Sequence, residues 1–552
     1  MHHRNPSLCI LHPAFRIAVA LATASATADT ATWIGGTGNW TDARNWDTDD
    51  VPGLTTNVVI DGDENVASVV TLASAETLAV SIGSLTIGSS DALAVLKASI
   101  KYTGKTVALS GTSLSHEGTL TIQNNGIKND NRVFVTFTQP SRISVGGIVS
   151  IAGLGGYTGC HTGFIMPVAG STNAGEIRVH QPLSRSNSAF LELAGVGQFV
   201  NNGRIVIRAT GSSSEGSAYL RFSYHETPGA CSCIDGTGEI ILDKEETTVV
   251  ANNTAIEGVK YNDTNVSTHT ITNGPQHTIR GTGIIRECAL ANAGLVRAEG
   301  TNGRLYVENS ALDYGGKAIR NLAGGRMVAM PGTGITIGAG GDQSKNAQFL
   351  NEGLLEARAG GDIDFRPGLT ASPSADANPA ATALDLSGTL AGGGTFSGKP
   401  MRLLADATLS PGDLSSTNGT GVSTAGTLTF ATNLTLSAGT TLDFQLGSRR
   451  SGLSDAVVVE GSLTLAGTLR LSGLNGAIPS GMYRILSCAP GQLIGDEMSL
   501  AVETVGGLPA PKLIVDPVGG TVDVVFPPLA AVLHVASSTS SSPSRPAAKP
   551  SP

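Results

Sequence analysis

Short runs of alternating apolar and polar residues fill most of the chain. The runs at 57–60 (NVVI) and 84–88 (SLTIG) carry an aliphatic side chain at every second position, and Gly, Ser, Asn or Asp residues close such runs. Alternation over a few residues between turn formers predicts β-strands. The best helical candidate, 92–100, fits a strand equally well. The pattern therefore predicts an almost all-β chain.

A weak internal repeat indicates how these strands stack. Its core is Asn-x-Gly followed by an aliphatic residue, and 28 positions separate Gly175 from Gly203 and Gly325 from Gly353. Similar strand-turn units roughly 20 to 50 residues apart are typical of a solenoid whose coils share one core. We expect the glycines to supply positive φ at the corners and the asparagines to form a side-chain ladder. The copies begin at Asn124, Asn173, Asn201, Asn292 and Asn351.

The two ends of the chain differ from this body. Residues 15–28 are mostly apolar or small and close in repeated Ala-x-Ala steps, which predicts a secretory signal cleaved near Ala28. No later run reaches the roughly 18 apolar residues of a membrane-spanning helix. The predicted order is a signal peptide (1–28), a Trp-rich cap (29–54), a β-solenoid (55–400), a C-terminal β-ladder that continues the solenoid (401–526) and a disordered Pro/Ser-rich tail (527–552).

Three features together resemble one protein family. They are the opening WIGGTGNW at Trp33, the Asn-x-Gly phrases, and the strand-rich stretch from LSPGD at Leu409 to GMYRIL. They are similar to the autotransporter-associated β-strand repeat proteins. The resemblance implies a right-handed parallel β-helix of the exported passenger type, mostly adhesin-like or structural, although some related β-helices act on polysaccharides. No translocator barrel is recognisable in the sequence.

Composition limits the partners. The chain has 35 Lys and Arg against 44 Asp and Glu, a formal charge of −9, and no basic run. Nucleic acid and anionic lipid are therefore not expected as partners, whereas extracellular polysaccharide or other cell-surface components are. Nucleophile-elbow, phosphate-loop and His-Glu-x-x-His motifs are absent from the sequence, and we expect no cofactor.

Trp33, Trp40 and Trp46 are the only tryptophans and lie within one short segment. Aromatic faces stack on sugar rings, so these residues are candidates for glycan binding. The alternative is that they close the open end of the solenoid, where an uncapped coil would expose core and strand edges. We favour the cap.

His225, Cys231 and Cys233 are the weak metal candidates. They lie together in YHETPGACSC, but zinc requires four ligands at close spacing and this pattern is not a standard one. A disulfide between Cys160 and either Cys231 or Cys233 is the simpler expectation in an oxidising compartment. The sequence therefore predicts no metal site.

Glu356, Asp362, Asp364 and Arg366 are the weak catalytic candidates. Strand alternation in GLLEARAGGDIDFR, which begins at Gly353, turns these side chains outward. Stacked coils would bring them onto one exposed ladder, on which two carboxylates could act as acid and base in glycoside hydrolysis. Opposite charges on such a ladder usually only neutralise one another in water. We expect a solvated face.

The sequence thus predicts a secreted or cell-surface protein that is not an enzyme: an adhesin-like structural β-helix. A β-helical polysaccharide lyase or glycoside hydrolase is the first alternative. A glycan-binding module is the second.

Overall fold

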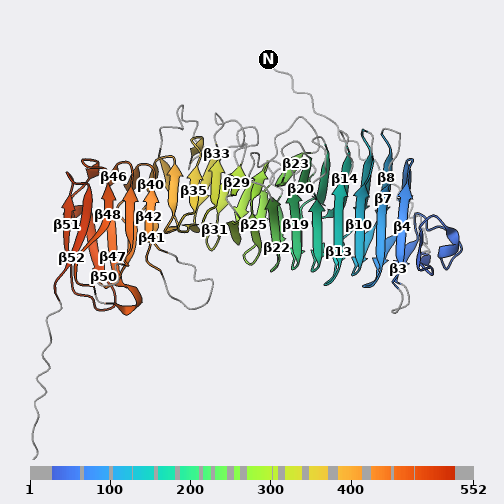
Figure 1. Cartoon of the computed structure of the whole chain (residues 1–552), viewed down its shortest axis with the longest axis horizontal. Helices are drawn as coiled ribbons and strands as arrows, with labels where there is room; N and C mark the ends of the chain where they lie inside the picture. The colour runs from blue at the N-terminus through green and yellow to red at the C-terminus, as the bar shows by residue number, and fades with distance from the viewer. Residues whose placement is uncertain are drawn as a thin grey trace, which may run out of the picture.

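Each coil of the chain is made of three strands separated by turns, and successive coils stack into a long parallel β-solenoid (Figure 1). The structure is a computed structural model. It describes residues 28–61, 67–98, 104–126, 129–153, 160–180, 187–209, 216–224, 231–244, 254–260, 270–300, 303–308, 318–338, 347–370, 383–412, 424–448, 453–477 and 479–528.

The first sheet forms one wall of the solenoid and has 13 strands. They are β1 (Thr30–Thr32), β3 (Asn57–Ile60), β6 (Ser84–Ile87), β9 (Ser113–His116), β12 (Arg142–Ile143), β15 (Thr172–Asn173), β18 (Gly197–Asn201), β21 (Cys231–Asp235), β24 (Thr270–Asn273), β27 (Ala289–Asn292), β30 (Ile319–Asn321), β33 (Ala347–Asn351) and β36 (Leu369–Thr370). A further sheet of 5 strands takes this place in the later coils. They are β37 (Leu384–Leu386), β40 (Met401–Leu403), β43 (Leu434–Leu436), β46 (Leu463–Thr464) and β49 (Leu493–Ile494).

The second sheet runs almost the full length of the solenoid. Its strands are β2 (Thr37–Asn39), β4 (Val69–Ser74), β7 (Ala92–Lys97), β10 (Thr119–Asn124), β13 (Ile148–Gly153), β16 (Glu176–His180), β19 (Arg204–Ala209), β22 (Glu239–Lys244), β25 (Thr278–Gly281), β28 (Leu295–Ala298), β31 (Arg326–Ala329), β34 (Leu354–Ala357), β38 (Thr389–Gly392), β41 (Thr408–Pro411), β44 (Thr441–Leu446), β47 (Gly467–Gly473) and β50 (Leu500–Thr504).

The third sheet begins one coil later. Its parallel strands are β5 (Leu78–Ser81), β8 (Thr106–Gly111), β11 (Arg132–Phe137), β14 (His161–Pro167), β17 (Ser188–Ala194), β20 (Ser217–Tyr224), β23 (Thr254–Lys260), β26 (Gly283–Arg286), β29 (Arg304–Glu308), β32 (Gly334–Gly338), β35 (Asp362–Phe365), β39 (Thr395–Gly398), β42 (Thr427–Phe430), β45 (Ala456–Val459) and β48 (Gly481–Cys488). The last two strands of this sheet are antiparallel: β52 (Thr521–Phe526) pairs with β48, and β51 (Lys512–Asp516) pairs with β52.

Helix is almost absent. The described residues contain three 3₁₀ turns, η1 (Ala43–Asn45), η4 (Leu474–Gly476) and η5 (Glu497–Ser499). The segment that fitted either helix or strand is strand β7. The predicted all-β parallel solenoid is therefore confirmed. None of the described helices has the length and apolar character needed to span a membrane. The predicted signal peptide, apart from Ala28, and nearly all of the predicted tail lie outside the described residues.

The core is a column of inward-facing side chains that continues from coil to coil. Phe349, Phe365, Phe396 and Phe430 are fully buried and stack in sequence, with ring centroids 5.8, 6.4 and 5.5 Å apart. Phe396 and Phe430 pair in register on the third sheet, whereas Phe365 pairs with Gly398 and Phe349 reaches the column from β33 of the first sheet. Contacts between neighbouring rings add to the hydrophobic contribution. Each coil thus depends on its neighbours for burial, as expected of a solenoid.

The repeated glycines are required by close backbone contact. A Cβ atom on Gly203 would lie 2.0 Å from the carbonyl oxygen of Gly175, and one on Gly353 would lie 2.2 Å from that of Gly325. None of these four residues has positive φ. The prediction that these glycines supply left-handed corners is therefore wrong, because the coils touch there so closely that a side chain does not fit.

Candidate functional site

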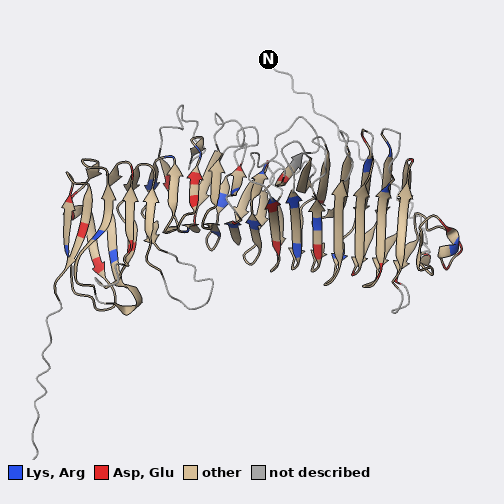
Figure 2. Cartoon of the chain, viewed as in Figure 1, with Lys and Arg blue, Asp and Glu red and all other residues tan. Residues whose placement is uncertain are grey.

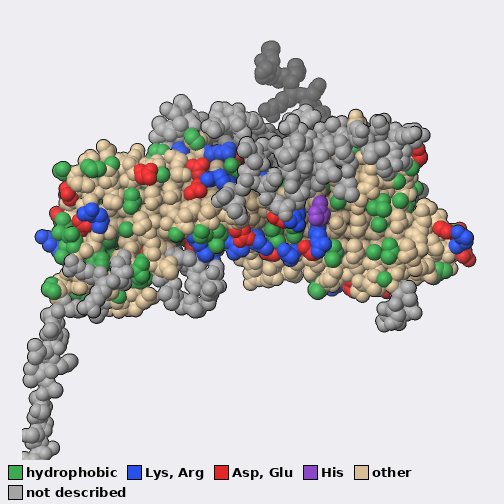
Figure 3. Space-filling model, viewed as in Figure 1, with side chains coloured by type: hydrophobic (Ala, Val, Ile, Leu, Met, Phe, Trp, Pro, Cys, Tyr) green, Lys and Arg blue, Asp and Glu red, His purple; other side chains and the backbone are tan. Residues whose placement is uncertain are grey.

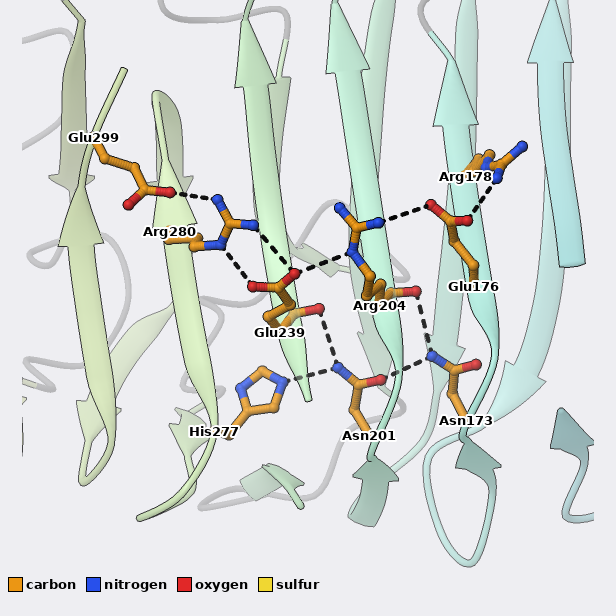
Figure 4. Close-up of polar contacts among 9 residues, drawn as sticks. All are labelled: Asn173, Glu176, Arg178, Asn201, Arg204, Glu239, His277, Arg280 and Glu299. Carbon is orange, nitrogen blue, oxygen red and sulfur yellow. Dashed lines mark hydrogen bonds and ion pairs between the residues drawn. The ribbon is translucent and has the colours of Figure 1, made fainter. Parts of the chain in front are cut away.

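A ladder of polar side chains runs inside the solenoid beneath the first sheet (Figure 4). The Asn173 amide donates to Oδ1 of Asn201 over 2.8 Å, and the Asn201 amide lies 3.0 Å from Nε2 of His277. On the other side of its ring, His277 Nδ1 lies 2.7 Å from Oδ1 of Asn273. The Asn273 amide then donates to Asn292 over 2.8 Å. All five side chains are fully buried.

The ladder continues through Asn321 and Asn351. Asn292 donates to Asn321 over 2.9 Å, Asn321 donates to Asn351 over 2.8 Å, and Asn351 donates to the carbonyl of Ser387. The predicted asparagine ladder is confirmed for four of its five residues. Asn124 is the exception, because it lies on β10 of the second sheet and donates to the carbonyl of Asn131.

His277 is neutral and acts as a relay between amides. Since Oδ1 of Asn273 only accepts, Nδ1 carries the proton and the unprotonated Nε2 accepts from Asn201. Burial lowers the pKa of His277 to about 4, against the opposing effect of Asp235 and Glu239. Every hydrogen bond of the ladder therefore runs in one direction along the solenoid.

A row of ion pairs covers the outer face of the second sheet above this ladder (Figure 4). Arg204 lies 3.7 Å from Glu176 and 3.0 Å from Glu239, and Arg280 contacts both Glu239 and Glu299. The hydrogen bond from Arg280 is the largest influence that lowers the pKa of Glu239. Charged residues gather in this middle part of the solenoid (Figure 2), and the space-filling view shows them as a band on its surface (Figure 3).

A second charged row follows the outer face of the third sheet. Strand register aligns Glu192, Arg221, Glu257, Arg286 and, one coil further, Glu308. Glu257 is almost fully buried and accepts from Arg221 at 2.7 Å and Arg286 at 3.0 Å. The charges alternate in sign, which makes the row internally neutral to within one charge.

Aromatic side chains form a parallel row beside these charges. Phe134 and Phe190 face each other with centroids 6.1 Å apart, and the Arg221 guanidinium lies 4.6 Å from the ring centroids of both Phe190 and Tyr219. Tyr306 lies three coils beyond Tyr219 in the same row. Phe134, Tyr219 and Tyr306 are only half-buried. Between Tyr219 and Tyr306 the row passes through Ala255 and Ile284, which are buried, so its partly exposed rings are separate from one another.

Two glycines in β32 let charged side chains meet across a coil. Arg304 of β29 forms an ion pair with Asp362 of β35 at 2.5 Å, and the two side chains meet over Gly334 of the strand between them. A Cβ atom on Gly334 would lie 2.7 Å from either side chain. Arg366 crosses Gly338 in the same manner and reaches Glu308 at 2.9 Å. Burial raises the pKa of Glu308, with Arg366 opposing the shift.

We define the third-sheet strip as these two rows and their continuation onto β35. Its members are Phe134, Phe190, Tyr219, Tyr306, Glu192, Arg221, Glu257, Arg286, Glu308, Arg304, Asp362, Asp364 and Arg366.

Three of the four predicted catalytic candidates lie in this strip. Asp362, Asp364 and Arg366 face outward at its end, Asp362 is paired with Arg304, and Asp364 accepts from Ser397 at 3.1 Å. Glu356 does not join them. It lies on β34 of the second sheet, fully buried, 3.4 Å from Arg326 and 3.3 Å from Arg358. The expected single exposed ladder is wrong, because the intervening turn places β34 and β35 on different walls.

The three tryptophans pack against one another at the N-terminal end of the solenoid. Trp46 makes edge-to-face contacts with Trp33 and Trp40, each with centroids 5.0 Å apart. Their exposed fractions are 1 % for Trp33 and 0 % for Trp40 and Trp46. Buried rings offer no face to a sugar, so the structure contradicts the glycan-stacking alternative for this cluster.

The thiol candidates do not converge on a metal site. Cys231 and Cys233 lie on β21, and His225 lies outside the described residues. Within the described ranges, no group of three or more His, Cys, Asp and Glu residues is placed to hold a metal ion. No disulfide joins the cysteines there either, so the expected bond from Cys160 to Cys231 or Cys233 is absent from the structure.

The third-sheet strip was not predicted from the sequence, although one signal for it is present there. SAFLELA at 188–194 and SAYLRFS at 217–223 match position by position and pair in register. Within that match, Phe190 pairs with Tyr219 in the aromatic row, and Glu192 pairs with Arg221 at the start of the charged row. The Arg366 to Glu308 contact has no such signal, because it spans two coils and depends on Gly338.

Comparisons with known proteins add little to these observations. Neither the protein-family models nor the curated proteins gave a match. Among solved structures, the chain is similar to the TibC-catalysed, hyper-glycosylated fragment of TibA, with 12 % identity, a TM-score of 0.30, and coverage of 79 % of this chain and 98 % of that one.

Proposed function

We propose that this chain is an exported, non-catalytic surface or matrix protein in which the solenoid is a stiff spacer and contact surface. The observation that carries the proposal is the second sheet, whose strands pair in parallel from β2 to β50 along the solenoid. Continuous backbone pairing over a shared core couples each coil to the next and resists bending. A stiff solenoid of this kind is suited to act as a spacer.

The charged outer faces support a passive role. On the second sheet, Glu239 forms ion pairs with both Arg204 and Arg280. On the third sheet, Glu257 forms ion pairs with two arginines. Each carboxylate oxygen of Glu257 is already paired with a guanidinium, Oε1 with Arg221 and Oε2 with Arg286, which supports a structural role for this side chain. Export is supported by the apolar segment and Ala-x-Ala steps at 15–28.

Cell fractionation with protease shaving tests the location, and mass spectrometry of the native protein tests the processing. We expect surface or extracellular protein whose N-terminus begins close to residue 29. Cytoplasmic protein that retains Met1 would overturn the proposal of export.

The enzyme alternative has a separate test. Purified protein and the Asp362→Asn, Asp364→Asn double variant are incubated with a polysaccharide panel, and new reducing or unsaturated sugar ends are measured. We expect none from either protein. Activity that the double variant loses would replace the non-catalytic proposal with a polysaccharide lyase or hydrolase.

A further inference from the structure

We infer that a second copy of this chain pairs with the edge strand β51, antiparallel and centred on Ile514, so that two solenoids join end to end. This inference goes beyond the proposed function and does not depend on it. The sequence of the strand, KLIVD at Lys512–Asp516, identifies the partner because it is complementary to itself.

One side of β51 is open. The strand pairs with β52 on its other side and is the outermost strand at this end of the solenoid (Figure 1). The 3₁₀ turn η5 lies nearby, but no residue in the described ranges forms a backbone hydrogen bond with the open side. An edge strand presents a row of N–H and C=O groups to which a further strand can bond. β51 can therefore accept one more strand.

The side chains of β51 divide between two faces. Leu513 and Val515 pack against the core. Strand alternation therefore turns Lys512, Ile514 and Asp516 outward. Lys512 and Asp516 are exposed, and Ile514 is partly buried. The outer face thus carries a cation at one end, an anion at the other and an aliphatic side chain between them.

A two-fold axis at Ile514 matches both faces. On the outer face, Lys512 of each copy lies opposite Asp516 of the other, and the two Ile514 side chains meet at the axis. On the inner face, Leu513 of each copy lies opposite Val515 of the other. Opposite charges and apolar side chains that face each other directly across an antiparallel pair stabilise the pairing. Every position of the five-residue strand therefore has a suitable partner.

Other registers lose this match. A slip of one residue brings the outer face of one copy beside the inner face of the other. Moving the axis to Leu513 or Val515 keeps the faces but places a charged side chain opposite Ile514. A lysine on an edge strand discourages pairing with strands that offer it no carboxylate. The charges therefore select a second copy in one register.

The small size of the contact sets the affinity. Stable protein interfaces bury roughly 1,200–2,000 Å² in total, and one pair of five-residue strands buries less. We therefore expect a reversible dimer with a dissociation constant in the micromolar range.

Sedimentation equilibrium of the full chain, from low to high micromolar concentration, tests the dimer. Ile514→Lys places two cations at the axis and should weaken dimerisation at least roughly tenfold. The matched control is Met482→Lys. Met482 is 62 % exposed and lies in the same row as Lys512, two strands in from the edge, so this variant should dimerise as the parent does.

Exchange of charges tests the register. Lys512→Asp places carboxylates opposite each other in both charged pairs, and Asp516→Lys places ammonium groups there, so each variant alone should dimerise at least roughly tenfold more weakly. An equimolar mixture of the two should form a heterodimer, because every aspartate of one chain then meets a lysine of the other. Asp516→Lys also removes the hydrogen bond that Asp516 accepts from the Gly519 N–H, so thermal melts of all variants accompany the measurement.

A parent chain that stays monomeric throughout the concentration range would overturn the inference. So would unchanged association of folded Ile514→Lys, an equal loss in Met482→Lys, or the absence of a heterodimer from the mixture of folded charge variants. Cell fractionation measures export separately, so either proposal can fail while the other stands.

Discussion

Protonation of His277 should interrupt the internal ladder, and this gives the most specific prediction. The imidazole must accept from Asn201 through Nε2 while it donates to Asn273 through Nδ1. A protonated ring has donors on both nitrogens, so Nε2–H would face an amide that also donates. Turning the Asn201 amide over would instead break its bond from Asn173.

The size and direction of the effect follow from the pKa. Burial lowers the pKa of His277 from its ordinary 6.5 to about 4. Between these two values the unfolded chain binds a proton at this position and the folded chain does not. The free energy of unfolding therefore falls as pH drops from about 6.5 to about 4 and changes little outside that window. The loss amounts to about 3 kcal/mol.

The assay compares the wild type with His277→Gln. A glutamine amide accepts from Asn201 and donates to Asn273 as the imidazole does, but it does not titrate. Denaturant unfolding is measured at steps between pH 7 and pH 4, and the difference in free energy between the two proteins is plotted. Other titrating groups, including the buried His116, are common to both and cancel.

We expect the wild type to lose about 3 kcal/mol relative to the glutamine variant over that window. A difference that stays constant with pH would refute the assignment of a neutral relay. A relative gain of stability at low pH would show that the folded protein binds the proton more tightly than the unfolded chain.

Three further predictions test other parts of the solenoid. In a denaturation assay, Gly353→Ala should lower the free energy of unfolding by roughly 2–3 kcal/mol, because its Cβ would lie 2.2 Å from the carbonyl oxygen of Gly325. The control variant Gly53→Ala has open space around its Cβ and should leave the free energy of unfolding unchanged in the same assay. Asn292→Leu should cost about 3 kcal/mol, since it leaves the amides on both sides without their ladder partner, and an unchanged unfolding midpoint would contradict the ladder's role. Trp46→Ala should cost about 4 kcal/mol and increase proteolysis of the N-terminal coils, and if limited proteolysis finds them equally protected, the tryptophans do not cap the solenoid.

The sequence by itself determined the strands and their inward faces. Apolar alternation in 353–366 placed Leu355 and Ile363 inward, and both are fully buried. The Asn-x-Gly copies similarly predicted the ladder at Asn173, Asn201, Asn292 and Asn351. These features are local, because a strand's period and the residue that suits a corner are set by the backbone of a few neighbouring residues.

The tertiary structure alone decided which outward side chains share a wall. Glu356 and Asp362 are six positions apart, yet the turn between them places one under the second sheet's arginines and the other on the third sheet beside Arg304. His277 enters the ladder only because its side chain reaches Asn201, 76 positions earlier, across the intervening coil of β21 and β22. Sequence periodicity specifies inside and outside for each strand, but the lengths and paths of the turns set the register between coils, and that register determines which side chains meet.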